Sequence, residues 1–296
     1  MASAQPAAIS YPLPRERNLI LASLLVLAGA AWAVLAWQGA TMDEMTLTMG
    51  MSAPLFIALW IVMMVAVMFP TAAPMILMFA RIHNSKRERG QTFVPTWVFT
   101  SAYLLVWSLT GLAAYAIAVS GDALANESAW VMDNAPRFGG GLLILAGAYQ
   151  LSPLKYVCLN KCRTPISFIL SSWKDGYGGS FRMGIEHGAF CLGCCWLLFL
   201  ILFPLGMMNI IVLALITLLI FAEKSLPIGA HMARAAALAL VLYGAIVVFQ
   251  PDALPMTMDS NASQMTGMAA GDSLDRTSDS ADMPAGDAAM PGESTQ

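Results

Sequence analysis

The chain of 296 residues is unusually apolar, since 58% of its residues are hydrophobic and 11% are charged. A water-soluble domain carries about 25% charged residues, so most of this surface faces something other than water. The formal net charge is −3, and the basic residues are scattered between apolar runs, which excludes a nucleic-acid-binding face.

Seven apolar segments have the length of a membrane span, which needs about 20 residues to cross a hydrocarbon core roughly 30 Å thick. The predicted spans are 19–37, 54–80, 93–119, 138–157, 183–203, 205–222 and 231–249. The sixth is short, and Pro204 with Gly206 would make 183–222 a tight hairpin, which leaves six spans as the alternative. We predict an all-α, polytopic membrane helix bundle over 19–249, preceded by a short segment, 1–18, and an uncleaved first span.

The loops between these spans alternate in charge. Basic residues occur in the N-terminal segment, in 81–92 and in 155–182, whereas 39–53 and 120–136 carry acidic residues and no basic ones. Positively charged loops remain in the cytoplasm. With seven crossings, this alternation predicts a bacterial inner-membrane protein with a cytoplasmic N-terminus and a periplasmic C-terminus.

The span 54–80 carries a stripe of sulfur. Its members are Met64, Met68, Thr71, Met75 and Met78. At about 100° per residue they fall within an arc of about 80°. Pro70 and Pro74 interrupt the stripe, and broken membrane helices often line pathways. Methionine is also an ordinary packing residue, so a metal pathway and a packing role both remain open.

The five cysteines form two clusters between positions 158 and 195, and the second lies in the span 183–203 together with a histidine. The candidate metal ligands are Cys158, Cys162, His187, Cys191, Cys194 and Cys195. The last four share a helix arc of about 100°. Thiolate and imidazole are donors that Cu(I) and Zn(II) favour, and cytoplasmic thiols stay reduced. We predict a metal site for Cu(I), with Zn(II) as the second metal, and leave thiol redox chemistry and packing as alternatives.

Glu186 is an ionisable residue inside a predicted span, where charged groups are costly and usually functional. It stands next to His187 in the sequence, but about 100° away around the helix. Its carboxylate would act as an acceptor behind the metal ligands, as a proton carrier, or as a partner of Arg182 or Lys155. The sequence does not decide among these roles.

Residues 250–296 form an acidic tail with eight acidic residues and one arginine, and the tail is rich in methionine. Because it holds few large apolar residues, we expect it to be disordered. Further methionines stand in the loop 39–53. The thioether selects Cu(I), so methionine outside and cysteine inside is the arrangement that a Cu(I) path between the two compartments needs.

Three stretches carry a resemblance to a known family: 68–75 (MFPTAAPM), 149–165 (YQLSPLKxxCxxxCRxP) and 184–196 (GxxxGxxCxGCCW). They resemble a bacterial family of predicted metal-binding integral membrane proteins of unknown function. The similarity covers roughly residues 54–249. The resemblance implies that the protein binds a metal, but it does not indicate which metal.

The sequence therefore favours an inner-membrane metal-handling protein that binds, transfers or transports Cu(I) through the methionine stripe to the Cys/His site. Its partners would be the lipid bilayer, the metal ion, and a metallochaperone or client metalloenzyme. A membrane thiol oxidoreductase and a structural subunit with packing cysteines are the alternatives. The sequence shows no P-loop or other energy-coupling motif, and thus gives no support for an enzyme or an active pump.

Overall fold

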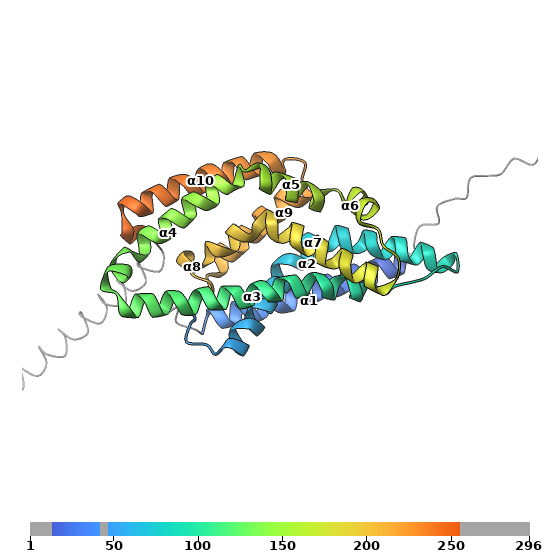
Figure 1. Cartoon of the computed structure of the whole chain (residues 1–296), viewed down its shortest axis with the longest axis horizontal. Coiled ribbons are helices and arrows are strands. Elements are labelled where there is room, and N and C mark those ends of the chain that lie inside the picture. Colours follow the sequence, from blue (N-terminus) through green and yellow to red (C-terminus); the bar gives the residue numbers. More distant parts are fainter. Residues whose placement is uncertain (1–13, 42–46, 255–296) are drawn as a thin grey trace, which may run out of the picture.

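The chain folds as a bundle of helices (Figure 1). The structure, a computed structural model, describes residues 14–41 and 47–254, and within these ranges it contains ten α-helices, one short 3-10 helix and no strand. The elements are α1 (Pro14–Gly39), α2 (Ala53–Glu88), α3 (Thr96–Glu127), α4 (Ala129–Gln150), α5 (Pro153–Arg163), α6 (Pro165–Ser172), α7 (Gly176–Leu200), α8 (Leu202–Leu205), α9 (Ile210–Ser225), α10 (Gly229–Phe249) and η1 (Pro251–Ala253). The all-α prediction is confirmed. Residues 255–296 of the predicted tail, most of the N-terminal segment and part of the loop 39–53 lie outside the described residues, whereas residues 251–253 of the tail form η1.

Five of the described helices are long and apolar enough to cross a membrane: α1, α2, α3, α7 continued by α8, and α10. A sixth crossing arises if α4 and α5, which meet at an angle of 62°, act as one broken span. The predicted number of seven is not confirmed. The predicted sixth span, 205–222, corresponds to α9, which has 16 residues and extends about 24 Å, short of the roughly 30 Å hydrocarbon core.

The predicted span 138–157 is wrong as a single straight helix, because the chain bends between α4 and α5. The Ser152 side chain accepts a hydrogen bond from the Lys155 backbone N–H at 3.1 Å and so caps a new helix, in which Pro153 occupies the first turn. Proline suits this position because its missing N–H would have no helical partner there. The bend directs α5, with Cys158 and Cys162, toward the middle of the bundle.

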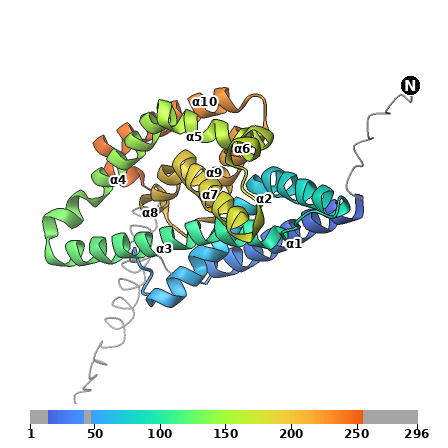
Figure 2. The ribbon, with the colours of Figure 1, turned by 45° about the vertical axis from the view of Figure 1, so that its right-hand side comes forward.

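The helices α2 and α7 form the centre of the bundle. In each, 61% of the most apolar stretch is buried, against 22% in α1 and in α10. Figures 1 and 2 show α1, α2 and α3 on one side, the pair of α4 and α10 on the other, and α7 with α9 between them. The outer helices thus present apolar surface outward, while the sulfur-bearing faces of α2 and α7 point inward.

Two glycines bring α7 against α3. A Cβ at Gly184 would lie 2.4 Å from the backbone oxygen of Phe99, and one at Gly188 would lie 2.8 Å from the Val106 side chain. Any larger residue would therefore push the two helices apart, as is common at close membrane-helix contacts. This close contact lets Tyr103 of α3 reach the thiol face of α7.

The two prolines inside α2 do not divide it, because it remains one helix of 36 residues. Pro70 has no N–H, so the carbonyl of Ala66, four residues earlier, loses its helical donor. The indole Nε1 of Trp32 on α1 donates to this carbonyl at 3.2 Å. A neighbouring helix therefore satisfies the backbone group that the proline frees, as the absence of water in a membrane requires.

Candidate metal site

Cys191 lies at the point where four helices meet. Its Sγ is 3.8 Å from Met68 Sδ on α2, 3.1 Å from the Tyr103 hydroxyl on α3 and 3.0 Å from Lys224 Nζ on α9. The side chain of Cys191 is fully buried, as are those of Met68 and Tyr103. The thiol stripe of α7 therefore meets the methionine stripe of α2 at this one sulfur atom.

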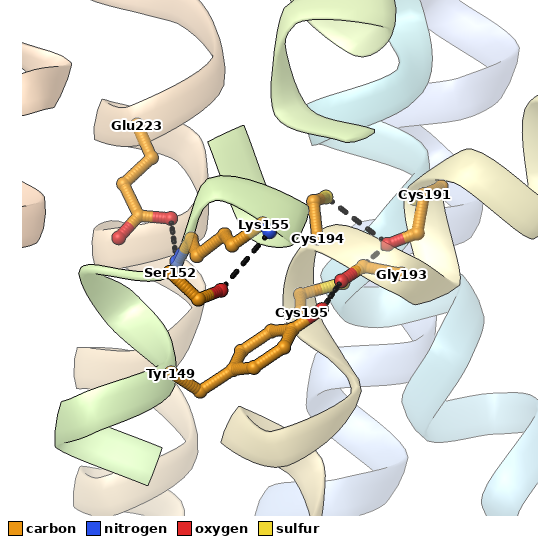
Figure 3. A network of polar contacts seen from close by, with 8 residues as sticks. All are labelled: Tyr149, Ser152, Lys155, Cys191, Gly193, Cys194, Cys195 and Glu223. Atoms are coloured by element: carbon orange, nitrogen blue, oxygen red, sulfur yellow. Dashed lines mark hydrogen bonds and ion pairs between the residues drawn. The ribbon is translucent and has the colours of Figure 1, made fainter. Parts of the chain in front are cut away.

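The other two cysteines of α7 turn back toward their own helix. The thiols of Cys194 and Cys195 both donate to the Cys191 carbonyl, at 3.0 and 2.9 Å (Figure 3). A carbonyl oxygen has two lone pairs and accepts both donors. These thiols are thus held by the backbone of α7, and their sulfur atoms would have to rotate to join a metal at Cys191.

The cysteines of α5 approach the same region from the other side. Cys162 lines a cavity together with His187 of α7 and Lys224 of α9. Cys158 lies against the backbone of α7, where a Cβ at Gly193 would be 2.7 Å from Cys158 Sγ. A side chain at position 193 would displace the Cys158 thiol, so the glycine leaves room for this cysteine beside α7.

His187 occupies an aromatic pocket one turn before Cys191. Its ring stacks on Tyr103 and Phe99, with centroids 5.4 and 5.8 Å away, and meets Phe168 of α6 edge-on at 5.4 Å. The Nδ1 atom is buried and has no hydrogen-bond partner among the described residues. A buried polar atom without a partner is costly, and such an atom in a ring that borders a cavity is a candidate ligand.

A cavity of about 190 Å³ lies next to this cluster. Its lining residues are Thr71, Pro74, Met75, Cys162, Arg163, Pro165, His187, Lys224 and Ser225. Ser225 is exposed, whereas His187 is 3% exposed. The cavity therefore leads from the end of the bundle at which α5 and α9 terminate to the buried ligands.

The six predicted ligands do not form a closed site. Within the described ranges, no group of three or more His, Cys, Asp and Glu side chains is arranged to hold a metal ion. The donors that meet instead mix types, because the Cys191 thiol contacts the thioether of Met68, while Cys162 lines the adjacent cavity. Thiolate and thioether sulfur select Cu(I), so the donor set fits copper better than it fits a tetrahedral Zn(II) site, which needs four ligands.

The predicted pathway residues lie on α2 as a mostly buried row. Met64, Met68 and Met75 are each at most 1% exposed, and Thr71 is 5% exposed. The Thr71 hydroxyl donates to the Met68 carbonyl at 3.1 Å and lines the cavity. Met78 lines a separate cavity of about 200 Å³ between α1 and α2. The row thus approaches Cys191 at Met68 and the cavity at Met75.

Two ion pairs complete this picture. Glu186 pairs with Arg182 on its own helix at 2.9 Å, which is one of the roles that the sequence left open. Lys155 pairs instead with Glu223 at 2.7 Å, and each side chain is 2% exposed (Figure 3). This buried ion pair ties α5 to α9.

Sequence reasoning missed Lys224. The predicted span ends at residue 222, so Glu223 and Lys224 fall just outside it, where charged side chains at the ends of spans usually reach water. In the structure Lys224 is 9% exposed and its ammonium contacts Cys191 and Thr71, at 3.0 and 3.5 Å. The signal in the sequence was the charged pair Glu223 and Lys224, which directly follows an apolar segment in a chain with few charged residues.

Comparison with known proteins identifies the family. Residues 57–247, more than half of the chain, match the family PpoB2, which is described as a copper chaperone. The matched range includes every described residue of the candidate site, from Met64 to Lys224. No curated protein and no solved structure matches the chain. The chain belongs to the PpoB2 copper chaperone family.

Proposed function

We propose that the protein binds Cu(I) inside the membrane at Cys191 and passes it on to another protein. The observation that carries this proposal is the 3.8 Å contact between Cys191 Sγ and Met68 Sδ, which joins the sulfur stripes of two helices. Cys162 and His187 are the further ligands that the cavity brings within reach. Membership of a copper chaperone family supports copper as the metal.

The chemistry of the donors suits a transferable Cu(I) ion. Thiolates bind Cu(I) strongly, whereas neutral thioethers select Cu(I) without adding charge. A site with one or two thiolates and a thioether therefore retains the ion but lets a partner thiol displace one ligand at a time. Cys194 and Cys195 are held on the Cys191 carbonyl and would be the replacement ligands during such an exchange.

We infer the two ends of the copper path from the placement of the methionine thioethers and of the cavity beside the cysteines. The cavity lies at the end of the bundle that carries Arg163, which the loop charges assign to the cytoplasm. Met64 lies on α2 toward the opposite end. We place the protein in the bacterial inner membrane, with the methionine row facing the periplasmic side and the cavity as the exchange port for a cytoplasmic metallochaperone or client metalloenzyme.

Metal binding by cysteine variants tests this function. Purified protein is loaded with Cu(I) in the presence of a competing chelator, and retained copper is measured. We expect about one copper ion per chain in the wild type, strong loss in Cys191→Ser and a smaller loss in Cys158→Ser, because Cys158 lies against Gly193 rather than beside Met68. Equal copper in the wild type and in Cys191→Ser would contradict the proposal.

Thiol trapping in intact cells tests the alternative function, a thiol oxidoreductase. All five cysteines are free thiols in the structure. An oxidoreductase must cycle a disulfide through its cysteines, so alkylation of thiols in intact cells would then reveal an oxidised fraction that changes with the supply of electron acceptor. We expect the cysteines to remain reduced or metal-protected under both conditions.

A further inference from the structure

Lys224 is a buried cation whose surroundings hold one group that can neutralise it. Among the described residues, the polar atoms in contact with its ammonium are Thr71 Oγ1 at 3.5 Å and Cys191 Sγ at 3.0 Å. Of these two, the thiol alone can ionise to an anion. An unpaired charge inside a protein in a membrane is very costly, so Cys191 is the side chain placed to compensate the ammonium of Lys224.

The neighbouring carboxylate does not serve Lys224. Glu223 precedes it on α9, but adjacent residues of a helix point about 100° apart, and Glu223 is paired with Lys155 of α5 at 2.7 Å. Arg163 lines the same cavity and donates to the Leu226 carbonyl at 3.0 Å. The carboxylate of Glu223 therefore does not cancel the positive charge that Lys224 places beside Cys191.

We propose that Lys224 determines metal specificity by disfavouring divalent ions at the Cys191 site. This inference rests on the proposed copper-binding function. The repulsion between an ammonium and a bound metal grows with the charge of the metal, so it is twice as large for Zn(II) as for Cu(I) at the same position. Two thiolates around Cu(I) also carry a net charge of −1, which the ammonium of Lys224 neutralises.

Charge accounts for the choice of metal where sulfur alone does not. Thiolates bind Zn(II) as well as Cu(I), so a cysteine cluster without a cation would accept both ions. A lysine 3.0 Å from the central sulfur adds a cost that depends on ionic charge. The effect is strong because both partners are buried and the surrounding protein screens charges less than water does.

The ratio of two association constants tests this role. Cu(I) and Zn(II) affinities of the purified full-length protein are measured by competition with chelators of known strength. We expect Lys224→Gln to lower the ratio of the Cu(I) to the Zn(II) constant at least tenfold, and Lys224→Arg to keep it. The matched control is Arg163→Gln, which removes a positive charge from the solvent-accessible part of the cavity and should change the ratio less than twofold.

The ratio separates an electrostatic role from a structural one. A variant that merely loosens the site would weaken both metals by the same factor and leave the ratio unchanged, and that result would overturn the inference. If Lys224→Gln fails to insert, Lys224→Met keeps the length of the side chain without an unpaired polar group and serves the same comparison. A wild type that binds no Cu(I) would overturn the proposed function itself, whereas Cu(I) binding with an unchanged ratio overturns only the assignment to Lys224.

Discussion

At the scale of single residues, the site depends on one sulfur atom with three different neighbours. Cys191 meets a thioether, a phenol and an ammonium within 3.8 Å. The ammonium donates a hydrogen bond to the sulfur, the phenol and the thiol share one in which either group can donate, and the thioether supplies a second soft donor. The residue therefore combines a buried thiol with a pre-positioned partner ligand for Cu(I).

Replacing the thioether alone should weaken copper binding without disturbing the fold. Met68→Leu keeps volume and hydrophobicity almost constant, a change that cores tolerate well, but removes the sulfur that faces Cys191. We expect the Cu(I) association constant to fall about tenfold or more, roughly 1.4 kcal/mol, when it is measured by chelator competition. The matched control, Met232→Leu on the outer helix α10, should leave the constant unchanged, and equal constants in wild type and Met68→Leu would exclude this methionine as a ligand.

At the scale of helices, α2 remains continuous because α1 supplies the donor that Pro70 lacks. In Trp32→Phe the Ala66 carbonyl would be buried without a partner, and we expect a loss of about 1–3 kcal/mol in unfolding free energy. Unfolding by denaturing detergent measures it, with Trp37→Phe as the control, since Trp37 is 67% exposed.

A second substitution isolates the hydrogen bond in that experiment. Pro70→Ala restores a backbone N–H for the Ala66 carbonyl, so Trp32→Phe should be less destabilising in the Pro70→Ala background than in the wild type. If Trp32→Phe causes the same loss in both backgrounds, the indole acts through packing and the interpretation of the 3.2 Å contact is wrong.

Much of this arrangement could be predicted from the sequence because helical periodicity is fixed. The spacing of His187 and Cys191 placed them on one face of a helix, and the spacing of Met64 and Met68 did the same for another. The contact between the sulfur atoms of Cys191 and Met68 could not be predicted, because it depends on how closely α7 approaches its neighbouring helices. The break at Ser152 was also missed, because an average of hydropathy over about 20 residues passes across a Ser-Pro cap.

At the scale of the whole molecule, the number of crossings determines which side each end of the chain faces. Five described helices are long and apolar enough to cross a membrane, and the α4–α5 pair adds a sixth crossing if it acts as one broken span. The helix α9 is shorter, and near its C-terminal end Glu223 forms a buried ion pair with Lys155. The alternation of the loop charges predicts seven crossings. The short α9 would then have to complete one of them, together with the turn that precedes it.

A reporter that is active only in the periplasm tests the topology when it is fused after Gln296. We expect activity there, because an odd number of crossings places the two ends of the chain on opposite sides. The same reporter inserted in the loop 81–92, after Glu88, should be inactive, since that loop is basic. Activity of a cytoplasmic reporter after Gln296 would show that α9 does not complete a crossing.

The central claim is that copper is held by sulfur from both α2 and α7. X-ray absorption at the copper edge of the Cu(I)-loaded, purified protein measures the type and number of ligands directly. We predict a shell dominated by sulfur, which loses one sulfur in Met68→Leu and is abolished in Cys191→Ser. A shell of nitrogen and oxygen, or a sulfur shell that is identical in wild type and Met68→Leu, would contradict a site shared between the two helices.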